Sequence, residues 1–105
     1  MNSSRYPALR HLFGAYFHQD FDLEYKDAED AINGFLSLEP QQEIEASVVE
    51  LHDLLKLGLS ESDLERLLIR LGLAYDATST GLTNSEWLEH VKQRLETRSN
   101  WNRNS

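Results

Sequence analysis

Hydrophobic residues recur along this chain at intervals of three and four positions, the spacing of one face of an α-helix. After Pro7, which suits the first turn of a helix, the apolar residues at this spacing are Leu9, Leu12, Phe13, Tyr16 and Phe17. A second run follows Asp27, a favoured helix-capping residue, and contains Ala28, Ala31, Ile32 and Phe35. Both segments are predicted to be amphipathic helices.

Three more segments show the same pattern. One is predicted from Pro40 to about Gly58, with an apolar face made of Ile44, Val48, Leu51 and Leu55. The next begins at Ser60 and stops before Gly72, and its packed residues are Leu64, Leu67, Leu68 and Leu71. The last opens with Thr83 and Glu86, spaced as a capping box, and should be buried through Trp87, Leu88, Val91 and Leu95.

These patterns predict an all-α fold, a compact single-domain bundle of about five amphipathic helices. No segment alternates with period two over a strand length, and the segment from Tyr75 to Leu82 is the longest clear break between helices. We expect residues 1–96 to form the helical domain. Residues 97–105 are predicted to be a polar, flexible tail that becomes ordered only where Trp101 finds a pocket.

Composition narrows the class of protein. A chain of 105 residues with 40% apolar and 27% charged residues fits one soluble domain. The absence of cysteine excludes disulfides, thiolate nucleophiles and iron–sulfur sites. Arg10 and His11 interrupt the only place for an apolar signal core, and no segment reaches membrane-spanning length. We expect a cytoplasmic protein with no membrane partner.

The formal net charge of −8 is concentrated in the middle of the chain. From Asp20 to Glu65 there are fourteen acidic residues, against only Lys26 and Lys56. Acidic residues at helix starts stabilise helices without any partner, but a surface built only for solubility normally mixes charges of both signs. The asymmetry therefore favours a surface that binds a basic protein, and such a field repels nucleic acid.

The acidic stretch from His18 to Asp30 does not match a known catalytic or metal motif. Asp20, Asp22 and Glu24 alternate like the first ligands of an EF-hand, but Tyr25 and Ala31 stand where that loop needs glycine and glutamate. His18 with Asp20, or with His11, reproduces no recognised metal-ligand spacing. We expect no catalytic residues, no metal and no cofactor.

Several segments in order resemble the immunity proteins of bacterial contact-dependent growth inhibition (CDI) systems. They are YPALRHLFGAYFHQDFDLEY, AINGFL, ELHDLL and LGLAYDATSTGLTNSEWLEHVKQRL, which together run from Tyr6 to about Leu95. The most specific pieces are YFHQDF, residues 16–21, and GLT, residues 81–83, followed by Trp87 and Leu88. Family members often have tryptophan where this chain has Phe21, a conservative difference.

The resemblance implies a function. Such immunity proteins stay in the cytoplasm and bind, one-to-one, the cognate C-terminal toxin domain of a CdiA-like exoprotein, and they inhibit it without catalysis. The toxins are frequently nucleases, including ribonucleases. Because the His18 and Asp20 positions belong to the shared motif, we assign them to a fold-stabilising hydrogen bond rather than to toxin recognition.

The acidic block and the resemblance together suggest where the toxin binds. A nuclease needs a basic groove for its substrate, and an acidic helical surface could occupy that groove. The candidate toxin-binding residues are Asp22, Glu24, Tyr25, Asp27, Glu29, Asp30, Glu43, Glu50 and Asp53. Phe17, Phe21 and Tyr16 are expected in the core.

Two other functions remain open from the sequence. The chain could be an acidic adaptor or regulator of another basic protein, which charge alone does not distinguish from an immunity protein. A small metal-dependent enzyme is the less favoured alternative, and it would require a strongly perturbed carboxylate or a bound metal.

Overall fold

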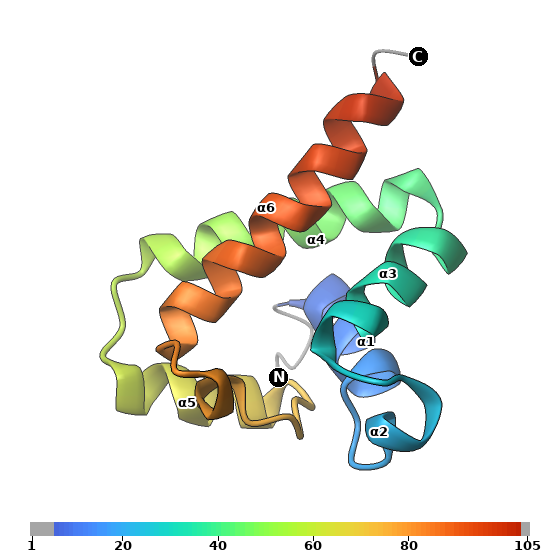
Figure 1. Cartoon of the computed structure of the whole chain (residues 1–105). Coiled ribbons are helices and arrows are strands. Elements are labelled where there is room, and N and C mark those ends of the chain that lie inside the picture. Colours follow the sequence, from blue (N-terminus) through green and yellow to red (C-terminus); the bar gives the residue numbers. More distant parts are fainter. Residues whose placement is uncertain (1–5, 104–105) are drawn as a thin grey trace.

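Helices make up all of the regular structure in the computed structural model, which describes residues 6–103 apart from the side chains of residues 80 and 98–103. In chain order they are α1 (Pro7–Tyr16), α2 (Phe21–Glu24), α3 (Ala28–Leu38), α4 (Gln41–Lys56), α5 (Glu61–Arg70), the 3₁₀ turn η1 (Ala77–Thr80) and α6 (Asn84–Arg103) (Figure 1). This confirms the all-α prediction, because the described residues contain no strand.

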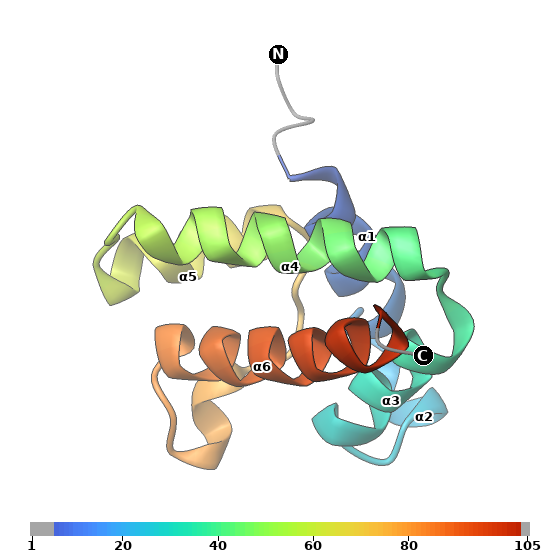
Figure 2. The ribbon, with the colours of Figure 1, turned by 90° about the horizontal axis from the view of Figure 1, so that it is seen from above.

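The core forms where α4 and α6 pack against each other and α1 and α3 close over them. Figure 2 shows α4 and α6 side by side, with their chains running in opposite directions. Each of the five predicted helices contributes fully buried side chains, the largest of which are Phe13, Phe17, Phe35, Leu9, Leu12, Ile32, Ile44, Leu51, Leu54, Leu68, Leu88 and Leu95. Within the described residues no helix is long and apolar enough to cross a membrane.

The predicted helix ends are largely confirmed. Asp27 and Ser60 cap α3 and α5 by accepting hydrogen bonds from the backbone N–H three residues on, at 2.9 Å and 3.2 Å. Thr83 and Glu86 form both hydrogen bonds of the capping box, at 2.9 Å and 3.1 Å. Gly72, after α5, has a φ of 105°, a conformation that favours glycine.

Gly72 also permits a close approach between distant parts of the chain. A Cβ atom at this position would lie 3.3 Å from the Cα of Gly14 in α1. The turn after α5 can therefore lie directly on the backbone of α1, where the N–H of Ala74 donates to the carbonyl of Phe17 at 2.9 Å.

The structure differs from the prediction at four places. The four-residue α2 and the turn η1 were not foreseen, and α6 continues to Arg103, beyond the expected boundary at residue 96. On α4 the buried positions are Ile44, Ser47, Leu51 and Leu54, whereas Val48 and Leu55 lie half-buried at the edge. On α5, Leu67 is likewise half-buried. The prediction for the Trp101 side chain falls outside the described side chains.

Candidate functional site

The segment before α3 is held to the core by aromatic packing. Phe21 contacts Phe17 and Tyr75, with ring centroids 5.7 Å and 5.3 Å apart, and Phe17 also packs edge-on against Trp87 at 5.3 Å. Phe17 and Tyr16 are buried and Phe21 is half-buried against the core, so these three positions agree with the prediction. Anchored in this way, α2 presents Asp22, Leu23 and Glu24 to solvent.

Leu23 was missed as a candidate because only charged and aromatic residues were considered. Its side chain is 82% exposed, the largest value among the exposed large hydrophobic residues of the described chain, and it stands between two exposed carboxylates. A single exposed leucine is common on a protein surface, but here it lies at the centre of the acidic segment. It could make apolar contact with a partner drawn there by charge.

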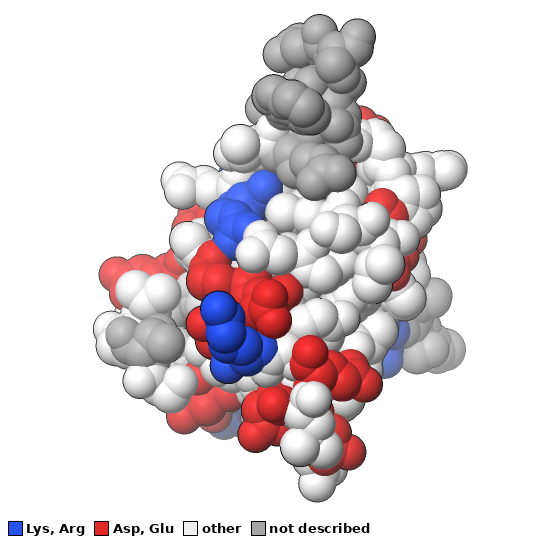
Figure 3. All heavy atoms as spheres, turned by 45° about the vertical axis from the view of Figure 1, so that its right-hand side comes forward, with Lys and Arg blue, Asp and Glu red and all other residues white. Residues whose placement is uncertain are grey.

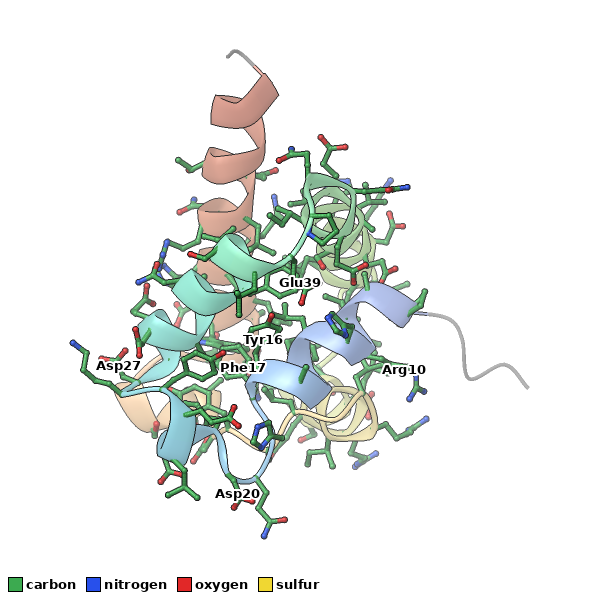
Figure 4. The ribbon with its side chains drawn as sticks, turned by 90° about the vertical axis from the view of Figure 1, so that its right-hand side faces the viewer. Arg10, Tyr16, Phe17, Asp20, Asp27 and Glu39 are labelled. Atoms are coloured by element: carbon green, nitrogen blue, oxygen red, sulfur yellow. The ribbon has the colours of Figure 1, made fainter. Side chains whose placement is uncertain are left out.

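The predicted hydrogen bond between His18 and Asp20 is present, but it uses the backbone of Asp20. The Asp20 N–H donates to Nδ1 of His18 at 3.1 Å, which leaves Nε2 of the neutral ring as donor to Glu24, 3.3 Å away. The carboxylate of Asp20 is free to face solvent, and Figure 4 shows Asp20 on the protruding loop between α1 and α2. The motif therefore shapes this loop and leaves its charge exposed.

Tyr25, predicted as a possible interface anchor, is half-buried against its own chain. Its ring stacks on Tyr16 with centroids 6.0 Å apart and lies over Gly34, where an added Cβ would come within 2.8 Å of it. Burial, together with the nearby carboxylates of Glu24 and Asp30, raises the pKa of the Tyr25 phenol. Tyr25 therefore packs as part of the fold, while one part of its ring remains accessible.

The three candidate carboxylates at the start of α3 all have contacts within the protein. Asp27 caps the helix, and Asp30 accepts a hydrogen bond from the N–H of Lys26 at 3.1 Å. Glu29 reaches α6, where it accepts from Nε2 of His90 at 2.6 Å and pairs with Arg94. Since carboxylates accept several hydrogen bonds, these contacts do not prevent them from binding a partner.

A groove lies beside these carboxylates, between the start of α3, the segment leading to α6, and α6 itself. Its volume is about 510 Å³, and its lining residues are Asp27, Ala28, Glu29, Tyr75, Leu82, Glu86, Trp87 and His90. Two of the predicted site residues, Asp27 and Glu29, line it. Glu86 and Leu82 were not predicted as site residues, because the sequence only marks them as parts of a helix start and a loop.

The three candidates on α4 lie apart from the others. Figures 1 and 4 show α2 and α4 on opposite sides of the molecule. Both carboxylate oxygens of Glu50 accept backbone N–H groups at the start of α1, from Ala8 at 3.1 Å and Leu9 at 3.0 Å. Asp53 is exposed beside a second hollow, lined also by Lys56, and Glu43 is half-buried.

The nine candidate residues therefore do not form one surface. Asp22, Glu24, Tyr25, Asp27, Glu29 and Asp30 gather around α2 and the start of α3, and the remaining three follow α4. Figure 3 shows acidic side chains collected in the lower part of the face it presents, with few basic ones among them. We refer to Asp20, Asp22, Glu24, Asp27, Glu29 and Asp30 as the α2–α3 acidic face. Among the described residues, no group of three or more potential metal ligands is placed to hold an ion.

Comparison with known proteins identifies the family. A model of the CdiI immunity protein family matches residues 5–95. The chain belongs to the CdiI immunity protein family. A search of curated proteins gave no match.

A solved structure agrees with the CdiI assignment. A chain of the crystal structure of a CdiA-CT/CdiI complex from Y. kristensenii 33638 superposes with a TM-score of 0.83 and 27% sequence identity. The alignment covers 87% of the present chain and 98% of that one. The resemblance stated from the sequence is thereby confirmed, and the protein is an immunity protein of the contact-dependent growth inhibition type.

Proposed function

We propose that this CdiI-family protein protects its own cell by binding, one-to-one in the cytoplasm, the C-terminal toxin domain of a cognate CdiA-like protein. The observation that carries the proposal is the family match, which spans residues 5–95. It is supported by the similar Y. kristensenii structure, which was determined as a CdiA-CT/CdiI complex. Inhibition would result from occupying the toxin, without catalysis by the immunity protein.

We further propose that the toxin is a nuclease, with ribonuclease as the first expectation. A nuclease active site binds a polyanion through basic side chains, so an acidic helical surface fits it by charge. The α2–α3 acidic face provides such a surface, and Leu23 adds apolar contact at its centre. By this account the face takes the place that the phosphates of the substrate would occupy.

The division of the acidic residues favours α2 and α3 over α4 as the docking side. Glu50 already uses both oxygens to hold the start of α1, so reorienting it toward a partner would cost helix-capping energy. Asp53 and Glu43 lie on the opposite side from α2, and a single domain docked on the α2–α3 acidic face would not cover them. We therefore place toxin contact first at Asp22, Glu24, Tyr25, Asp27, Glu29 and Asp30.

The proposal is tested by titrating this protein calorimetrically into the CdiA C-terminal domain encoded beside it, with cleavage of RNA and DNA by that domain followed in parallel. We expect saturation at one immunity protein per toxin domain and loss of cleavage at the same ratio. A folded, active toxin domain that neither binds nor loses activity would contradict the function. Binding without any cleavage to inhibit would leave immunity standing and remove the nuclease assignment.

A further inference from the structure

We propose that the groove between α3, the segment around Leu82, and α6 receives an arginine side chain of the toxin domain. This inference rests on the proposed function, and it names a specific contact that the charge argument alone does not provide. The groove, of about 510 Å³, is large enough for a long side chain, and its lining combines apolar and acidic groups from three parts of the chain.

The apolar part of the groove suits the stem of a long basic side chain. Ala28, Tyr75, Leu82 and Trp87 contribute to the lining, and Leu82 remains 36% exposed at this site. Arginine and lysine bury their methylene stems along apolar surface while the charged end reaches polar groups. A purely polar ligand would leave this part of the groove without favourable contacts.

Three carboxylates give the groove its charge. Asp27, Glu29 and Glu86 belong to the lining, and its eight residues include no lysine or arginine. Arg94 and His90 already engage Glu29, so Asp27 and Glu86 are the carboxylates left to balance an incoming cation. Such a lining repels phosphate and other anions, which excludes a nucleotide as the occupant.

Arginine fits this arrangement better than lysine does. Asp27 and Glu86 come from different helices, and each donates capping capacity through one oxygen, to the N–H groups of Asp30 and Thr83. Their remaining lone pairs can accept further hydrogen bonds. A guanidinium offers five N–H donors in a planar fork and stacks on aromatic rings, so it can bond to two carboxylates beside Tyr75 and Trp87.

The local chemistry allows a test that removes the charge and keeps the fold. In Asp27→Asn the amide oxygen still caps α3, and in Glu86→Gln the capping box is retained, since asparagine and glutamine serve at these positions. The matched control is Glu65→Gln with Glu89→Gln, two exposed residues outside the groove that change the net charge by the same amount. Affinity and dissociation rate of each double variant are measured with the CdiA C-terminal domain encoded beside this protein.

We expect the Asp27→Asn/Glu86→Gln variant to bind at least about tenfold more weakly, mainly through faster dissociation, and the control to change by less than about threefold. One arginine-to-alanine substitution in the toxin domain should weaken binding to the wild-type protein and have no further effect with the groove variant. Equal affinity of the two double variants, or no toxin arginine with this coupling, would overturn the groove assignment alone. Absence of binding by the wild-type protein would overturn the proposed function as well.

Discussion

Ser47 shows how a single polar residue can be misplaced energetically inside this fold. Its side chain is fully buried on α4, and its hydroxyl has no hydrogen-bond partner within the described structure. A buried polar group without a partner costs about 1–3 kcal/mol, and alanine is also the better helix former. We predict that Ser47→Ala raises the free energy of unfolding by about 1 kcal/mol, measured by urea denaturation.

Ser62→Ala on α5 is the control for this prediction. Ser62 is exposed, so its replacement changes helix propensity with little change in burial. A gain at Ser47 no larger than the gain at Ser62 would mean that the buried hydroxyl costs nothing. Neither substitution touches the α2–α3 acidic face, and toxin affinity should stay unchanged in both variants.

Individual side chains also explain what the sequence could not predict about the site. The spacing on α4 indicated a buried face, but apolar type alone favoured Val48 and Leu55, and the structure buries Ser47 and Leu54 in their place. The acidic candidates were identified by residue type and position. Whether a carboxylate faces solvent or a distant N–H group depends on packing between helices, and the local pattern carries no signal for it.

At the scale of helices, glutamates from one element complete the ends of another. Glu50 on α4 holds the start of α1, and Glu61 on α5 accepts from the N–H groups of Asn84 and Ser85 at the start of α6, at 2.7 Å and 3.2 Å. The first N–H groups of a helix have no partner within it, so these contacts satisfy otherwise free donors. Part of the acidic excess therefore stabilises the fold.

Glu61 provides a test of this role through pH. Burial raises its pKa, but the hydrogen bonds from Asn84 and Ser85 outweigh burial, so the pKa of Glu61 is lowered from 4.5. A lowered pKa means that the contribution to stability is complete above about pH 4.5 and is lost as pH falls through the lower, folded-state value. We predict that Glu61→Gln destabilises the protein at pH 7 and that the difference from wild type shrinks at pH 3.

The comparison uses urea denaturation of both proteins at the two pH values, with Glu65→Gln on the same helix as control. Glu65 is exposed and its carboxylate caps no helix in the described structure, so its replacement should produce a small difference that changes little with pH. An equal loss for Glu61→Gln at pH 7 and pH 3 would show that the charge of Glu61 does not matter at the start of α6.

The long helices were predictable because each has a repeated apolar face and a recognisable end, such as the caps Asp27 and Ser60. The short α2 was not, since four residues are too few to show a helical period. Its position depends on Phe21 packing against Tyr75, more than fifty residues away in the chain. Elements of this kind are set by tertiary contacts, and α2 is the element that carries Asp22, Leu23 and Glu24.

Across the whole molecule, the acidic residues fall into sets with different roles. Glu39, between α3 and α4, accepts hydrogen bonds from the Tyr16 hydroxyl at 2.7 Å and from His11 at 2.9 Å, and Figure 4 shows Tyr16 and Glu39 pointing toward each other. Burial raises the pKa of Glu39, but these two hydrogen bonds lower it further than burial raises it. Together with Glu50 and Glu61, this residue belongs to the fold. The exposed carboxylates of α2 and its flanks are left to create the field that a basic partner meets.

Only one side of the molecule can face a single toxin domain, so charge reversal on opposite sides should have unequal effects. We predict that the variant Asp20→Lys/Asp22→Lys/Glu24→Lys associates with the toxin domain at least about tenfold more slowly than wild type, with a flatter dependence on salt. All three residues are exposed, and Asp20 contributes only its backbone N–H to the bond with His18, so the fold should survive. The rates are measured by stopped-flow mixing at several salt concentrations.

The matched variant, Glu43→Lys/Asp53→Lys/Glu65→Lys, changes the net charge equally but lies on α4 and α5. If the field of the whole protein steered association without regard to place, both triple variants would slow it to the same extent. A larger effect of the α4 and α5 substitutions would move the docking side away from α2 and toward the hollow beside Asp53. Slower association confined to the α2 variant, with dissociation little changed, would instead indicate that this side guides the encounter, whereas groove contacts govern how long the complex lasts.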